Sequence, residues 1–130
     1  MSSRGRRPYR ALPEARAIAV QRGCVQMAEH GPECRYDFTI TNTLPVAFII
    51  VRFAPRVLAA QREIEAEFHT AILPLRSIAS DGSVSRELWL RSKHGTWRFF
   101  RVTADGIVEI DRHGQVLADK EGSVSGPVTV

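Results

Sequence analysis

The chain has 130 residues, of which 44% are hydrophobic and 25% are charged. These proportions are typical of a single globular domain and exclude a wholly disordered chain, a collagen-like chain and a coiled coil. The longest apolar run, Pro45–Val51, is far shorter than the roughly 20 residues of a membrane-spanning helix. No apolar stretch follows the basic N-terminus, so we expect a cytoplasmic protein with no membrane span and no secretory signal peptide.

The positive charge is concentrated at the N-terminus. The first ten residues contain no acid and four arginines: Arg4, Arg6, Arg7 and Arg10. Once these four are set aside, 14 basic and 14 acidic side chains remain, so the net charge of +4 belongs to this segment. Such a segment is typical of an arm that lies along phosphate groups, and equally of a solvated terminus. We predict a flexible basic arm over residues 1–12, a single α/β domain over 13–118 and a loosely packed tail over 119–130.

The first half of the domain shows one helix and three strands. A helix is predicted from Pro13 to about Arg22, because apolar residues recur at helical spacing after a proline suited to the first turn. Two strands with alternating apolar and polar residues follow at Cys24–Glu29 and Arg35–Thr41. The apolar run Val46–Phe53 has the length and β-branched content of a central strand covered on both faces.

The second half begins with a longer helix and continues as strands. The helical period predicts one helix after Pro55, running to about Ile72 and ended by Pro74. The strands expected after it, as a C-terminal antiparallel meander, are Arg86–Arg91, Trp97–Thr103, Ile107–Ile110 and, at the edge, Gln115–Ala118.

The first two of these strands are predicted to form a hairpin across His94–Gly95, since such a pair suits a two-residue turn. That register places Leu90 opposite Phe99, Trp89 opposite Phe100 and Arg91 opposite Arg98. The hairpin interleaves four aromatic residues with the basic residues Arg91, Lys93, Arg98 and Arg101. This mixture is typical of a nucleic-acid-binding surface and of a dimer interface rich in Trp and Arg. It is equally typical of a strand pair whose aromatic residues are buried in the core and whose basic residues face solvent.

The order of elements, with an Asp early on the second strand and a basic residue near the end of the apolar third strand, resembles the restriction-endonuclease-like superfamily, the PD-(D/E)xK nucleases. The resemblance covers about residues 13–92 and implies an αβββαβ core with a mixed sheet. In that family the Asp and an acid on the third strand hold a divalent metal. A lysine two residues beyond that acid orients the attacking water, and a helix at the start often adds a Glu.

Three residues of this chain take these places. The resemblance assigns Asp37 as the metal ligand, Glu14 as the first-helix acid and Arg52 as the residue in the lysine position. Ile50 then stands where the third-strand acid belongs, and isoleucine cannot bind a metal. The resemblance therefore implies Mg²⁺ as a cofactor if the site is catalytic, and no cofactor otherwise.

These residues leave several hypotheses. The leading one is a nucleic-acid-binding protein with a nuclease-like fold and a degenerate metal site, in which Asp37 and Arg52 form an ion pair. In the second, the missing acid has migrated to Glu63, Glu65 or Glu67, and the protein is an active nuclease that uses Mg²⁺ or Mn²⁺. In the third, the protein is a non-enzymatic interaction module that forms a homodimer through the Trp/Phe hairpin.

Overall fold

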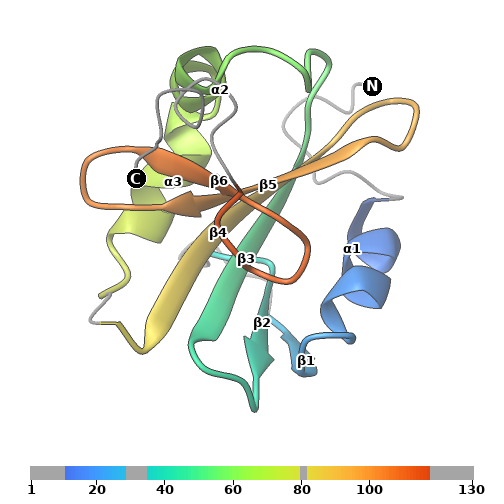
Figure 1. Ribbon diagram of the computed structural model, residues 1–130, viewed down its shortest axis with the longest axis vertical. Coiled ribbons are helices and arrows are strands. Elements are labelled where there is room, and N and C mark those ends of the chain that lie inside the picture. The colour runs from blue at the N-terminus through green and yellow to red at the C-terminus, as the bar shows by residue number, and fades with distance from the viewer. Residues whose placement is uncertain (1–10, 29–34, 80–81, 118–130) are drawn as a thin grey trace, which may run out of the picture.

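The computed structural model describes residues 11–28, 35–79 and 82–117. Within these ranges the chain is α/β, with a six-stranded mixed sheet and three helices (Figure 1). The elements in chain order are α1 (Ala11–Ala19), β1 (Cys24–Met27), β2 (Phe38–Thr41), β3 (Val46–Phe53), α2 (Gln61–Glu67), α3 (His69–Arg76), β4 (Val84–Arg91), β5 (Trp97–Val102) and β6 (Ile107–Ile110).

The strands lie side by side in the order in which they follow along the chain, β1 to β6. All neighbouring pairs are antiparallel except β3 and β4, which are parallel. A parallel pair needs a crossover connection, and α2 and α3 provide it. Both central strands are therefore paired on both edges.

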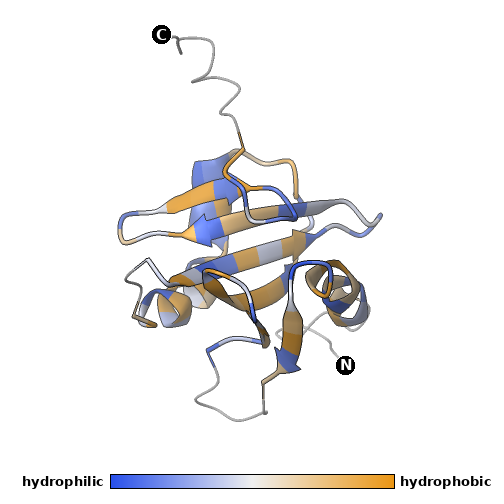
Figure 2. Cartoon of the chain, turned by 60° about the horizontal axis from the view of Figure 1, so that its bottom comes forward, coloured by the Kyte–Doolittle hydropathy of each residue, from blue (hydrophilic) through white to orange (hydrophobic). Residues whose placement is uncertain are grey.

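The sheet separates two apolar cores. On one face α1 packs against inward side chains that include Phe38, Ile49 and Trp89. On the other face residues of α2 and α3 pack against Leu88 and others. In Figure 2 hydrophobic residues occur along the strands, and the helices carry both hydrophobic and hydrophilic residues. The expectation that Val46–Phe53 is a central strand covered on both faces is confirmed.

The prediction of one long helix after Pro55 is wrong. Residues 55–60 form turns and a short extended stretch, and the helical segment that follows is divided at Phe68, whose φ of −104° and ψ of 25° interrupt α2 before α3 begins. Pro74 lies inside α3, which ends at Arg76. Proline removes one N–H from a helix without forbidding it where the neighbouring turn packs well, and here Ile72 and Leu75 on either side of Pro74 are fully buried.

The hairpin register is shifted by one residue from the prediction. Trp89 lies opposite Phe99, Leu90 opposite Arg98 and Arg91 opposite Trp97. Ser92 N–H bonds the Thr96 carbonyl at 2.8 Å, so the loop holds three residues, with Gly95 at φ 91°, in place of the expected two. The predicted pairing of Arg91 with Arg98 therefore does not occur, and the two arginines lie on opposite faces of the sheet.

Several boundaries also differ. β1 and β2 are shorter than predicted, and the edge strand expected at Gln115–Ala118 is reduced to a bridge between Ile110 and Val116. The meander of β4, β5 and β6 follows the prediction. Arg4, Arg6, Arg7, Arg10 and the tail 119–130 lie outside the described residues. No helix in the described ranges is long and apolar enough to cross a membrane.

We expect Leu88→Ala to lower the free energy of unfolding by about 2–5 kcal/mol, because it leaves a cavity between the sheet and α3. Leu88 is fully buried, whereas the side chain of Leu58 is 81% exposed. Leu58→Ala is therefore the matched control and should change stability by about 0.5 kcal/mol or less. Urea unfolding of both variants measures the difference, and equal losses would contradict the described packing.

Candidate functional site

Asp37 and Arg52 lie side by side, as the leading hypothesis expected. Arg52 Nη1 donates to Asp37 Oδ2 at 3.3 Å, and the Asp37 side chain is almost fully buried while that of Arg52 is one-third exposed. Alternation along β3 places Arg52 on the same face as Ile50, the face covered by α2 and α3. The two residues thus form an ion pair at the edge of the second core.

The Asp37 carboxylate also completes the sheet. The Asp37 N–H bonds the Ile49 carbonyl, and β2 begins at the next residue. Asp37 Oδ2 accepts the Val51 N–H at 2.7 Å, which takes the place of a strand partner at that point. A carboxylate that accepts a buried backbone N–H and a guanidinium group has a structural role without any metal.

Glu14 does not join this pair, so the prediction of one site containing Glu14, Asp37 and Arg52 is wrong. Glu14 on α1 accepts two hydrogen bonds from the Arg91 guanidinium, at 2.7 and 3.0 Å. These bonds raise the pKa of Arg91 above its ordinary value. Arg91 shares the α1 face of the sheet with Trp89, whereas Arg52 points to the opposite face. The error arose because the sequence did not reveal which face of the sheet α1 covers.

No alternative acid replaces the missing metal ligand in the described part of the chain. The three glutamates of α2 form ion pairs with arginines: Glu63 and Glu67 with Arg56, and Glu65 with Arg76. Ile50 is buried in the second core. No group of three His, Cys, Asp or Glu side chains within the described ranges is arranged to hold a metal ion.

The hairpin is mostly interior. Trp89, Phe99 and Phe100 are buried within a single chain, so they offer no surface for stacking on bases or for a partner subunit. The Arg98 guanidinium lies 4.9 Å from the centre of the Phe100 ring and binds Glu109 through two hydrogen bonds. It also donates to two backbone carbonyls before α2. Lys93 is exposed in the loop between β4 and β5.

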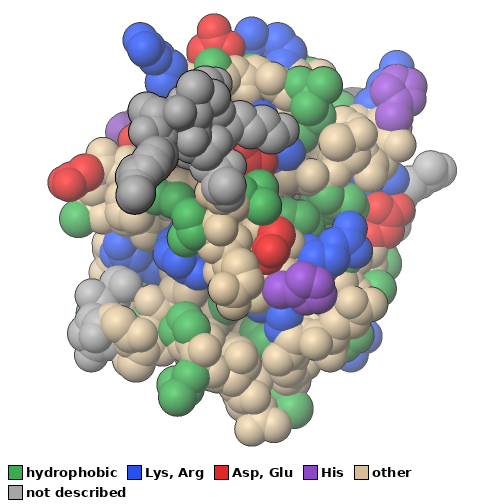
Figure 3. Space-filling model, in the orientation of Figure 1, with side chains coloured by type: hydrophobic (Ala, Val, Ile, Leu, Met, Phe, Trp, Pro, Cys, Tyr) green, Lys and Arg blue, Asp and Glu red, His purple; other side chains and the backbone are tan. Residues whose placement is uncertain are grey.

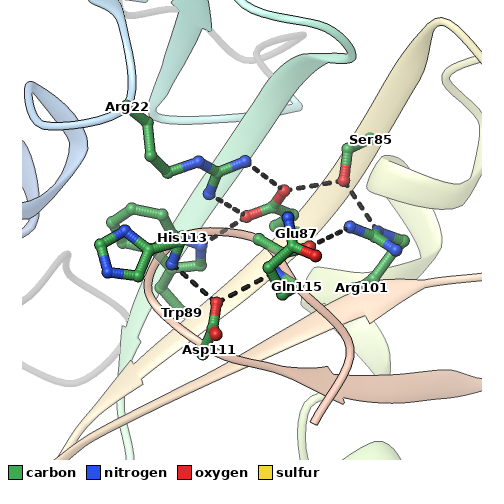
Figure 4. Close-up of polar contacts among 9 residues, drawn as sticks. Arg22, Ser85, Glu87, Trp89, Arg101, Asp111, His113 and Gln115 are labelled. Atoms are coloured by element: carbon green, nitrogen blue, oxygen red, sulfur yellow. Dashed lines mark hydrogen bonds and ion pairs between the residues drawn. The ribbon is translucent and has the colours of Figure 1, made fainter.

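A second polar site, which the sequence analysis missed, surrounds Glu87 on β4. Glu87 is fully buried and its two oxygens bind the Arg22 guanidinium at 2.9 and 3.0 Å. Ser85 Oγ and Trp89 Nε1 also donate to this carboxylate, at 2.7 and 2.9 Å. Ser85 in turn accepts from Arg101 Nε at 3.1 Å, which extends the network to β5 (Figure 4).

The donors around Glu87 control its ionisation. Burial alone would raise the pKa of Glu87, but the hydrogen bonds and positive charge of Arg22, with the Ser85 and Trp89 donors, outweigh it and lower the pKa below its usual range. Glu87 is therefore ionised in the folded protein. One signal in the sequence was available: Glu87 is the only acid within an otherwise apolar and basic strand, where a buried charge needs a partner.

A cleft of about 270 Å³ opens beside this network. Its lining comes from the turn after α1, the loop before β3, the end of β5 and the loop after β6, and comprises Gln21, Arg22, Thr43, Leu44, Pro45, Arg101, His113, Gly114 and Gln115. Gly114, at φ 90°, lies directly against Arg22, since a Cβ there would lie 2.9 Å from Arg22 Nη2. Glycine is thus required both by the turn and by the close approach of the guanidinium.

The loop after β6 is held in shape by Asp111. Its Oδ1 accepts the N–H groups of His113 and Gln115 at 2.8 and 3.0 Å. Although burial opposes ionisation, these bonds lower the pKa of Asp111 below its ordinary value. These hydrogen bonds fix the conformation of the loop that lines one side of the cleft.

Comparison of the chain with protein-family models, with curated proteins and with solved structures gave no match. The geometry is therefore the basis for the functional assignment.

We expect Glu87→Gln to lower the free energy of unfolding at neutral pH by about 3–5 kcal/mol, because it leaves Arg22 without its buried counter-charge. The lowered pKa of Glu87 gives the wild type stability that is fully present above the ordinary glutamate pKa of about 4.3 and is lost as pH falls through the folded-state pKa. The Glu87→Gln variant should lack this pH-dependent contribution to the free energy of unfolding.

Urea unfolding between neutral and acid pH measures both effects. Glu63→Gln is the control, because that side chain is 54% exposed and 4.0 Å from Arg56, which predicts a loss of about 1 kcal/mol or less. A Glu87→Gln variant that keeps the full acid sensitivity of the wild type would show that Glu87 is not the group responsible.

Proposed function

We propose that the protein binds nucleic acid without cutting it, on a nuclease-like fold in which an ion pair has replaced the metal site. The observation that carries this proposal is the contact between Asp37 and Arg52 with Ile50 buried beside it. At the position where a nuclease needs two acids and a mobile proton acceptor, this chain has one acid bound to a guanidinium that stays protonated.

The topology supports the same proposal. One helix precedes three antiparallel strands, helices then cross over, and the fourth strand is parallel to the third. This is the element order that the resemblance to the restriction-endonuclease-like superfamily implies. The later strands β5 and β6 extend the sheet as an antiparallel meander.

The position of α1, which follows the basic segment in the sequence, provides further support. The arm joins α1 at Ala11, one turn before Glu14, which binds Arg91 at the end of β4. Lys93 follows two residues later, and Arg52 lies next to Leu90 on the neighbouring strand. The first turn of α1 therefore lies near the end of the sheet that carries Arg52, Arg91 and Lys93.

The body of the protein adds little surplus charge of its own. On the face drawn in Figure 3, basic and acidic side chains are interspersed and form no broad basic patch. Arg91 and Arg98 are each bound to a glutamate. We infer that the arm supplies most of the phosphate contacts, because counterion release requires cations that are not already paired.

Replacing Arg4, Arg6, Arg7 and Arg10 by Ser should weaken binding to duplex DNA at low salt and reduce its salt dependence. Each phosphate contact contributes about 0.9 to the slope of log affinity against log salt, so the slope should fall by about 3 to 4. Fluorescence anisotropy titrations over a range of salt concentrations measure it.

The matched control replaces four exposed arginines of the body, Arg16, Arg56, Arg62 and Arg112, by Gln. It removes the same charge and should change the slope by about 1 or less. Equal effects of the two variants would show that net charge alone drives binding. Absence of salt-dependent binding by the wild type would reject the proposal.

Asp37→Ala should lower the free energy of unfolding by about 1–3 kcal/mol, because the Val51 N–H loses its acceptor, and should leave DNA affinity unchanged. Asp105→Ala, at an exposed turn, is the control for stability. The wild type should leave DNA intact in Mg²⁺ or Mn²⁺. Cleavage that disappears in Asp37→Ala would instead establish the active nuclease.

A further inference from the structure

The cleft beside Glu87 lies at the other end of the sheet from Arg52 and Arg91. It is bounded by the loop that leads into β3 and by the end of β5, whereas Arg52 and Arg91 end β3 and β4. Its lining contains two arginines and a histidine and no acidic side chain. Nothing in the proposed nucleic-acid contact uses it.

We propose that this cleft is a binding site for a phosphate group, either inorganic phosphate or the phosphate of a small monoester. The inference depends on how its arginines are fixed, and it is independent of the proposed function.

Both guanidinium groups are held before any ligand arrives. Glu87 binds Arg22 through two parallel hydrogen bonds, and the Arg22 side chain is only 8% exposed. Arg101 is held by Ser85 Oγ through its Nε and by the Gly114 carbonyl through its Nη2. Held side chains lose little rotational entropy on binding, which is the main cost of fixing an arginine.

Arg101 retains hydrogen-bonding capacity toward the cleft. Its Nη1 has no hydrogen-bond partner in the described ranges, whereas Nε and Nη2 are both used. Neither Glu87 nor Asp111 lines the cleft; Glu87 is bound by Arg22, Ser85 and Trp89, and Asp111 Oδ1 accepts two backbone N–H groups. A ligand in the cleft therefore meets a guanidinium edge and not a carboxylate.

The rest of the lining fits a phosphate with a small polar substituent. Thr43 supplies a hydroxyl group, Gln21 and Gln115 supply amides, and His113 supplies an imidazole. These groups can donate hydrogen bonds to phosphate oxygens, which are the stronger acceptors, and can also bind hydroxyl groups. The volume of about 270 Å³ is at the lower limit of the sites that hold small molecules.

The test is a titration of the isotope-labelled full chain followed by two-dimensional amide NMR. Sodium phosphate and adenosine monophosphate should both shift the signals of Thr43, Gly114 and Gln115, and adenosine should not. A monophosphate that titrates at lower concentration than phosphate identifies a phosphorylated small molecule as the ligand type, and equal titration identifies phosphate itself. Equal shifts with adenosine, or no shifts at these residues, would overturn the proposal.

Arg101→Gln should weaken phosphate binding about tenfold, the effect of losing one hydrogen bond to a charged group. Arg112→Gln is the matched control, because Arg112 is exposed in the same loop and does not line the cleft; it should change affinity by about twofold or less. If Arg101→Gln is unfolded, Gln115→Glu places an acid at the exposed rim and must abolish the shifts. Equal binding by wild type and Gln115→Glu would refute the site.

The variant lacking the four arm arginines separates this inference from the proposed function. It should lose DNA affinity and bind phosphate as the wild type does. Loss of phosphate binding in that variant would show that the arm, and not the cleft, holds the anion.

Discussion

The buried carboxylate of Glu87 is the constraint on which much of this structure depends. It lies in the middle of β4, one of the two central strands, where water cannot solvate it. The cost of burying the charge is offset because Arg22, Ser85 and Trp89 all donate to it. Since Arg22 follows α1, the same bonds fix the turn after α1 against the sheet. Through Ser85 they also position Arg101, so a single buried charge connects three segments of the chain: the turn after α1, β4 and β5.

The fold prediction was accurate for segments that a local sequence pattern defines and inaccurate for features that depend on loop length. Val46–Phe53 and Ile107–Ile110 were predicted to the residue, because short apolar runs bounded by turns define a strand from both ends. The hairpin register was missed because it depends on whether the loop has two or three residues. His94–Gly95 suits both lengths, and the choice was made by Ser92, whose Oγ accepts the N–H groups of His94 and Thr96. One residue of shift exchanges the faces of a whole strand, which is why Arg98 was placed beside Arg91 and not beside Glu109.

The candidate sites were likewise predictable only where a local sequence pattern determines which side chains meet. The pairing of Asp37 with Arg52 was predictable, because Asp37 directly precedes β2, Arg52 lies on the neighbouring strand β3, and alternation places them on one face. The place of Glu14 was not, because it depends on which face α1 covers, and that is decided by the packing of Ala15 and Ile18 against Phe38 and Trp89. The contacts among Arg22, Glu87 and Arg101 could not be predicted for a related reason. These residues come from three segments far apart in the sequence, and no local pattern brings them together.

Many arginines of the described domain bind carboxylates or backbone carbonyls of other segments of the same chain. Arg76, Arg86 and Arg98 each donate to backbone carbonyls of other segments, which joins the crossover region to β4 and β5. Arginine suits this work because its planar group reaches several acceptors at once and keeps its charge when buried. An arginine used in this way has fewer N–H groups left to donate to a phosphate group. The number of arginines in the sequence is therefore larger than the number available at the surface to bind an anion. In the described part of the chain, exposed arginines such as Arg16, Arg62 and Arg112 remain open to solvent. Arg101 differs from them because its guanidinium is held in place at the cleft by Ser85 and the Gly114 carbonyl.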